Sequence, residues 1–227
     1  MRKRRVFLIL SIAVPVAVLV RVCGREREPE YEGKSLSKWV LAYETGVSEP
    51  NEIDKAILHI GTNGIPYLLN WIRYERPSWT KQHATVNRTN RLLAPTRKPT
   101  DAKKLSRARG ATCALIALGP KAQGAVGDLA EILSDPQAPE GGECAAHILA
   151  FLGPAGLPPL VAALTNQESP ARLRYAVARC IRHMGTNALP AVPALRLLLN
   201  DPDVDVRREA TNSLRKINPK IVERATR

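Results

Sequence analysis

The amino-acid sequence predicts an all-α protein whose helices stack in pairs as an α-solenoid. Aromatic residues make up only 4% of the 227 residues, and alanine and leucine dominate after residue 108, which favours closely packed helices over a β-sandwich. Two stretches also repeat each other, "HIGTNGIPYLL" from His59 and "HMGTNALPAVPAL" from His183. In both, a glycine ends one helix and a proline follows in the first turn of the next.

Glycines mark the ends of the repeating units. The anchor positions are Gly61, Gly119, Gly153, Gly185 and, in the fifth place, Asn218, and the last four are 34, 32 and 33 residues apart. This period is typical of helical solenoids. Eight, four and one residues before each anchor stand fifteen apolar residues, here called the column residues: Ile53, Ile57, Ile60, Ala111, Leu115, Leu118, Ala145, Leu149, Leu152, Val177, Ile181, Met184, Ala210, Leu214 and Ile217. Their spacing puts them on one helix face, so we expect all of them to be buried.

Apolar residues past the anchors predict a second helix in each unit. In the units at Gly119 and Gly185 they recur seven, ten, thirteen and fourteen positions on, and both units close with Asp-Pro, at Asp135 and Asp201. Each unit therefore reads as helix, glycine turn and helix.

The stretch "LPAVPALRLLLNDPDVDVRREATNSLRKI" resembles the HEAT-repeat family, particularly its short bacterial HEAT-like repeats, which pigment-attaching lyases also carry. Asp201, the Val206-Arg207 pair and the column of small residues fit that family's pattern. The resemblance covers residues 107–218 well and residues 51–72 in part. It implies a scaffold that hosts many functions.

The resemblance also implies that aspartates and arginines bond between successive repeats. Asp201, Arg174 and Arg207 occupy the positions for such a ladder. Ala108 and Gly142 stand at the arginine position of two other units, so we expect the ladder to be interrupted there.

The N-terminal segment predicts a membrane anchor or an export signal. A basic tail, residues 1–5, precedes an apolar run, residues 6–23, and a linker, residues 24–34. The run spans eighteen residues, against about 20 that a membrane-spanning helix needs. Because basic residues precede the run, we expect the tail in the cytoplasm and the bulk of the chain on the periplasmic side of the inner membrane. Cleavage would instead release a secreted form, and the sequence leaves both open.

Residues 35–72 predict a capping helix and a first, degenerate repeat, ahead of the HEAT-like repeats at residues 107–227. Leu36, Trp39, Val40 and Tyr43 follow helical spacing on one face, with Ser35 as the N-cap. The ends of a solenoid need such a cover.

A basic loop insertion, residues 73–106, separates the first repeat from the second. Eleven Lys or Arg and two acidic residues lie from Arg73 to Arg109. Pro77, Pro95 and Pro99 are expected to interrupt any long helix there. We expect the insertion to bind a protein partner, and its positive charge would suit an acidic one. The expected contact residues are Arg73, Arg76, Trp79, Lys81, Arg88, Arg91, Arg97, Lys98, Lys103 and Lys104. For the aromatic residues near its start, Trp71, Tyr74 and Trp79, packing against the first helices is favoured over stacking on bases.

The sequence offers no enzyme signature, and we expect no catalytic residues, cofactor or metal. Cys113, Cys144 and Cys180 lie in predicted helices as small buried residues, and whether two of them pair stays open. His59 and His183 are assigned to last helical turns, and His147 has no partner of a catalytic type nearby in sequence. "DPDVDVRREATN" lacks the glycine and glutamate of a calcium loop.

Two functions remain. The first is a non-catalytic protein–protein interaction scaffold of the bacterial cell envelope. The alternative is nucleic-acid binding through the basic insertion, since some DNA glycosylases are built from HEAT-like repeats; export argues against it. A small-molecule substrate is not expected. Finding which side of the membrane holds residue 100 would distinguish these two functions.

Overall fold

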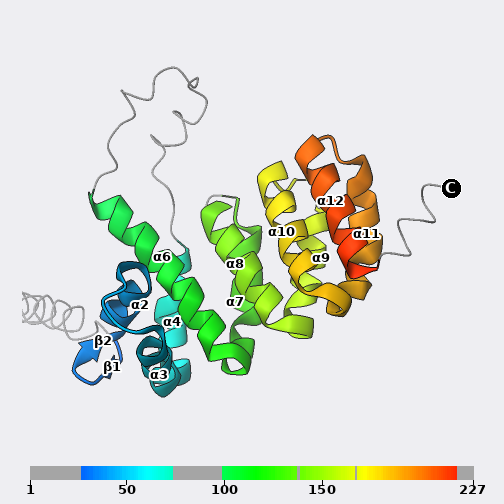
Figure 1. Ribbon diagram of the computed structural model, residues 1–227. Coiled ribbons are helices and arrows are strands. Elements are labelled where there is room, and N and C mark those ends of the chain that lie inside the picture. Colours follow the sequence, from blue (N-terminus) through cyan, green and yellow to red (C-terminus); the bar gives the residue numbers. More distant parts are fainter. Residues whose placement is uncertain (1–26, 74–98, 137–138, 167, 219–227) are drawn as a thin grey trace, which may run out of the picture.

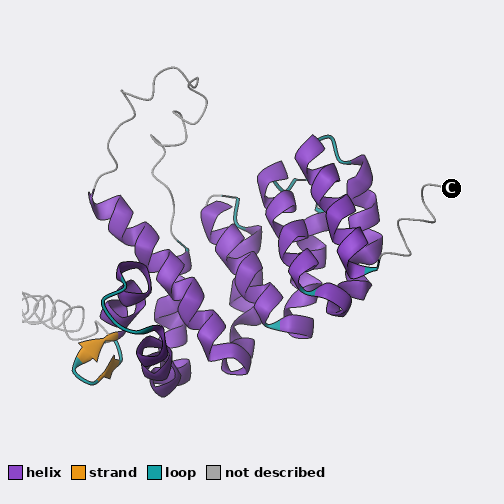
Figure 2. Cartoon of the chain, in the orientation of Figure 1, coloured by secondary structure: helices purple, strands orange, loops and turns teal. Residues whose placement is uncertain are grey.

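A computed structural model describes residues 27–73, 99–136, 139–166 and 168–218 of the chain (Figure 1). The described residues form a stack of helices with one small hairpin at its N-terminal end (Figure 2). The fold is therefore an α-solenoid, as predicted. The predicted anchor and residues 74–98 of the basic insertion lie outside the described residues. None of the helices within the described ranges has the length and apolar character to cross a membrane.

A hairpin and one helix cover the N-terminal end of the stack. Strands β1 (Glu30–Tyr31) and β2 (Lys34–Ser35) pair antiparallel before helix α2 (Leu36–Thr45). The two-residue turn between the strands has φ values of 48° and 70°, which suits a tight hairpin. The hairpin occupies part of the predicted linker, so the all-α prediction was wrong at this point.

The capping helix α2 is amphipathic, as its spacing predicted. Leu36, Trp39 and Val40 are buried. Ser35 stands at the N-cap position, but its side chain makes no capping bond. Instead, the backbone N–H of Ser37 donates to Glu28 Oε2 at 3.0 Å. A carboxylate nine residues earlier in the chain thus satisfies this helix end.

Helix pairs follow the cap in chain order. The first helices of the units are α3 (Pro50–Ile60), α6 (Pro99–Leu118), α8 (Pro139–Phe151), α10 (Ala171–His183) and α12 (Val204–Ile217). The second helices are α4 (Ile65–Ile72), α7 (Val126–Ser134), α9 (Leu157–Thr165) and α11 (Val192–Leu197), the last followed by the 3-10 turn η7 (Leu198–Asn200). The turns within the units are the 3-10 helices η1 (Gly61–Gly64), η4 (Gly119–Ala125), η5 (Gly153–Gly156) and η6 (Gly185–Ala191).

The anchor glycines end the first helices as predicted. Gly61, Gly119, Gly153 and Gly185 have φ between 53° and 68°, the left-handed region that residues with a Cβ rarely adopt. Asn218 differs, because it is extended at φ −153°. It ends α12 with an ordinary bond from its N–H to the Leu214 carbonyl at 3.0 Å.

The column residues form the centre of one continuous core. Fourteen of the fifteen are buried and Met184 is partly buried. The core forms because the first helices pack side by side from α6 through α8 and α10 to α12, and the second helices follow the same order from α4 to α11 (Figure 1). No single pair could bury its apolar face alone.

Helix α6 begins earlier than the predicted boundary of the basic insertion. It starts at Pro99, which was expected to interrupt a helix. Proline suits the first turn of a helix because that N–H needs no partner. The last part of the predicted insertion is therefore the start of a 20-residue helix.

Candidate functional site

The predicted partner-binding residues do not gather into one described site. Arg73 Nη2, just past α4, lies 3.4 Å from Glu131 Oε2 and 3.8 Å from Asp128 Oδ1 on α7. Lys103 and Lys104 are exposed on α6. The others lie outside the described residues: Arg76, Trp79, Lys81, Arg88, Arg91, Arg97 and Lys98.

Trp71 on α4 contacts an arginine of the next repeat. The guanidinium carbon of Arg107 on α6 lies 5.1 Å from the centre of the Trp71 ring, within the range of a cation–π contact. Tyr74, like Trp79, lies outside the described residues.

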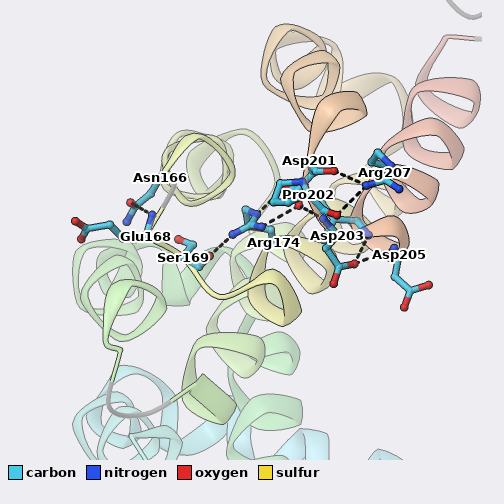
Figure 3. Close-up of polar contacts among 10 residues, drawn as sticks. Asn166, Glu168, Ser169, Arg174, Asp201, Pro202, Asp203, Asp205 and Arg207 are labelled. Atoms are coloured by element: carbon cyan, nitrogen blue, oxygen red, sulfur yellow. Dashed lines mark hydrogen bonds and ion pairs between the residues drawn. The ribbon is translucent and has the colours of Figure 1, made fainter.

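A buried ion pair links helix α10 to the loop between α11 and α12 (Figure 3). Arg174 on α10 donates from Nε to Asp201 Oδ2 at 2.7 Å and from Nη2 to Asp201 Oδ1 at 2.9 Å. Arg174 Nη1 also donates to the carbonyl of Ser169. The hydrogen bonds from Arg174 lower the pKa of Asp201. The resemblance implied such bonds between successive repeats, whereas this one joins the first helix of the Gly185 unit to the aspartate that closes the same unit.

Asp203, in the same Asp-rich stretch, caps helix α12. Asp203 Oδ1 accepts from the N–H groups of Asp205 at 2.8 Å and Val206 at 3.1 Å. Arg207 does not reach a carboxylate of another repeat and donates to the carbonyls of Asp201 at 2.6 Å and Pro202 at 2.9 Å (Figure 3). Asp201 and Asp203 therefore serve the ion pair and the helix cap.

Two further arginines of α10 bind carboxylates on the helices beside it. Arg182 Nε lies 2.8 Å from Glu209 Oε1 on α12. Arg172 forms an ion pair with Glu143 on α8, and this contact raises the pKa of Arg172. Helix α10 is thus held on both sides by charge pairs in addition to its apolar face.

A groove of about 330 Å³ opens between the C-terminal ends of α8 and α10. Its lining consists of His147, Ala150, Phe151, Cys180, His183 and Met184. Phe151 is 68% exposed, whereas Leu149 and Leu152, close to it in the sequence, are buried in the core. Exposed large apolar side chains beside a groove are typical of binding surfaces.

One edge of this groove is electropositive. Arg179 Nη2 on α10 lies 3.5 Å from His147 Nε2 on α8. Burial, followed by the positive charges of Arg179 and His183, lowers the pKa of His147. The lowered pKa favours the neutral form of His147, whose contact with Arg179 joins α8 to α10.

The repeat itself carries the signal that pairs these residues. His147 and Arg179 each stand six residues before their anchor glycines, and Phe151 and His183 each stand two before. Because successive first helices pack side by side, equal positions in neighbouring repeats become neighbours in space. Aligning the repeats by their glycines therefore predicts that His147 lies near Arg179 and Phe151 near His183.

The other histidine that the structure describes is His59, and the described cysteines are Cys113, Cys144 and Cys180. His59 lies in the last turn of α3, as predicted, with its ring centre 4.5 Å from that of Tyr31. Cys113, Cys144 and Cys180 are free thiols. Burial raises the pKa of all three, that of Cys180 to about 12, so they stay protonated and weakly reactive. Of the three, Cys180 is buried, Cys144 is partly buried and Cys113 is exposed, so the prediction that all three are buried was wrong for two of them.

Comparison with protein families gives a match to HEAT repeats over residues 157–226. This range includes α9, α10, α11 and α12, together with the Arg174–Asp201 pair and one side of the groove. It supports the HEAT-repeat family for this part of the chain. No curated protein and no solved structure matches the chain significantly.

Proposed function

We propose that the protein is a non-catalytic interaction scaffold of the bacterial cell envelope, in which the HEAT repeats bind a protein partner. HEAT repeats generally mediate protein interactions, and this stack includes such repeats at its C-terminal end. The observation that carries the proposal is the groove between α8 and α10, where Phe151 is exposed beside an apolar surface. Partner binding would bury that side chain, as aromatic residues commonly do at interfaces.

The proposed location rests on the sequence of the first 23 residues. Four basic residues at positions 2 to 5 precede the apolar run, and such a pattern keeps the N-terminus in the cytoplasm. The repeats would then face the periplasm while the apolar run holds them at the membrane.

A pull-down from detergent-solubilised membranes tests the function. The bait is the full chain as wild type, as Phe151→Ser, and as Leu197→Ser. Leu197 on α11 is also an exposed large apolar residue, at 66%, so it is a matched control outside the groove. Phe151→Ser should recover the partner about tenfold less well than the wild type, and Leu197→Ser should recover it normally.

Equal recovery by both variants would contradict the proposed function. Recovery of nucleic acid with the wild-type bait, sensitive to salt and indifferent to Phe151→Ser, would instead favour the alternative based on the basic insertion.

A further inference from the structure

We propose that the groove between α8 and α10 binds a partner segment in which a large apolar side chain stands next to a carboxylate. This inference rests on the proposed function and names the chemistry of the partner. It follows from two properties of the groove, its apolar lining and an arginine at its edge that is not paired with a carboxylate.

The apolar lining fits one large side chain. Ala150, Phe151, Cys180 and Met184 supply carbon and sulfur surface around a space of about 330 Å³, near the lower end of the roughly 300–1,000 Å³ typical of ligand pockets. This space is too small for a whole helix. A single aromatic or aliphatic side chain would fill it and cover the exposed ring of Phe151.

The charge at the edge distinguishes Arg179 from the other arginines of α10. Arg172, Arg174 and Arg182 each form an ion pair with a carboxylate on a neighbouring element. Among the described residues, no carboxylate forms an ion pair with Arg179, whose Nη2 lies 3.5 Å from His147 Nε2. Its guanidinium has five N–H donors in a planar fork that matches a carboxylate. A partner carboxylate would supply what the other three arginines receive from within the chain.

His147 makes this recognition sensitive to pH. The charged groups that act on His147 are Glu143 on its own helix and Arg179 and His183 on α10. A bound carboxylate would favour protonated His147 and so raise its pKa. Binding then takes up a proton, so affinity should increase as the pH falls toward the pKa of His147 in the free protein, which lies below its usual value.

The test uses two capped hexapeptides, Gly-Ser-(4-fluoro-Phe)-Glu-Gly-Ser and its Gln counterpart. Each is titrated by fluorine NMR against the full chain in nanodiscs of zwitterionic phosphatidylcholine. The Glu peptide should bind about fivefold tighter than the Gln peptide, as expected for a half-buried charged hydrogen bond. Arg179→Gln should remove that difference. Arg196→Gln, which removes the same charge from the exposed face of α11, should preserve it.

Three outcomes would overturn the inference: equal affinity of the two peptides, a difference that survives Arg179→Gln, or no binding of either peptide. Phe151→Ser should weaken both peptides, because it removes the apolar wall. The pull-down separates the two levels of the proposal. If recovery of the partner still requires Phe151 but neither peptide shows the expected binding, the scaffold function is supported and the proposed preference for a carboxylate is contradicted.

Discussion

The Arg174–Asp201 pair is nearly buried and links helix α10 to the aspartate that closes the same repeat. The exposed fraction is 11% for the Arg174 side chain and 6% for that of Asp201. Removing one partner of such a pair leaves the other charge without compensation in a medium that solvates it poorly. The intact pair therefore adds little net stability, but losing one partner lowers the free energy of unfolding strongly.

Arg174→Met should lower the free energy of unfolding by about 3 kcal/mol, because it leaves Asp201 buried without its cation. Urea unfolding followed by circular dichroism measures this change. Arg208→Gln is the control, because its pair with Asp205 has both side chains more than half exposed and should contribute less than about 1 kcal/mol. Equal effects of the two substitutions would show that the buried pair has no special role.

Single residues also show which features of the site the sequence could predict. The family resemblance singled out Arg174 and Asp201 as bonding residues but implied bonds between repeats, and the His147–Arg179 contact could be read from their equal distance to the anchor glycines. The exposure of Phe151 could not, since it depends on what the neighbouring helix presents. Cys113 was predicted to be buried, yet it stands six residues before Gly119, the position that faces the groove in the next two repeats.

The elements of the stack were predictable where a pattern recurs. Column residues and anchor glycines define the ends of α3, α8 and α10 because the same physical requirement is repeated in each unit. The hairpin and the start of α6 occur once, so no repeat revealed them. Pro99 illustrates the ambiguity: a proline breaks a helix from inside and begins one from its first turn, and only the packing of α6 decides between these roles.

Close contact between α2 and α6 depends on a glycine. A Cβ on Gly110 of α6 would lie 2.1 Å from the carbonyl oxygen of Val40 on α2. Gly110→Ala should therefore push the capping helix away and destabilise the fold by about 2–3 kcal/mol.

Gly127→Ala on α7 is the matched control for Gly110→Ala. A Cβ there would have no atom within 4 Å, and alanine is favoured over glycine in a helix by up to about 1 kcal/mol. Thermal unfolding of the two variants should thus shift in opposite directions. A stable Gly110→Ala variant would mean that α2 does not pack closely on α6.

At the scale of the whole molecule, the net positive charge is concentrated in two segments of the chain. Of the net charge of +13, the segments 1–27 and 73–109 carry all the excess, and the rest of the chain is slightly acidic. The described stack is held together by its apolar core and by paired charges.

The orientation of the whole chain can be read with two fusions placed after Arg227. In the proposed topology the basic residues before the apolar run hold the N-terminus inside, so a phosphatase that folds only outside the cytoplasm should be active. A fluorescent protein that matures only in the cytoplasm should stay dark at the same place. The reverse pattern would put the basic insertion within reach of nucleic acid and favour that alternative.

Photocrosslinking from the groove tests most directly whether this surface binds a partner. A benzophenone amino acid replaces Phe151 in the full chain expressed in cells, and in a parallel strain it replaces Leu197, which is similarly exposed on α11. Irradiation should give one discrete adduct with a partner protein from position 151 and none from position 197. The adduct should weaken with Arg179→Gln and persist with Arg196→Gln. Absence of an adduct at position 151, or equal adducts at both positions, would contradict a partner site between α8 and α10.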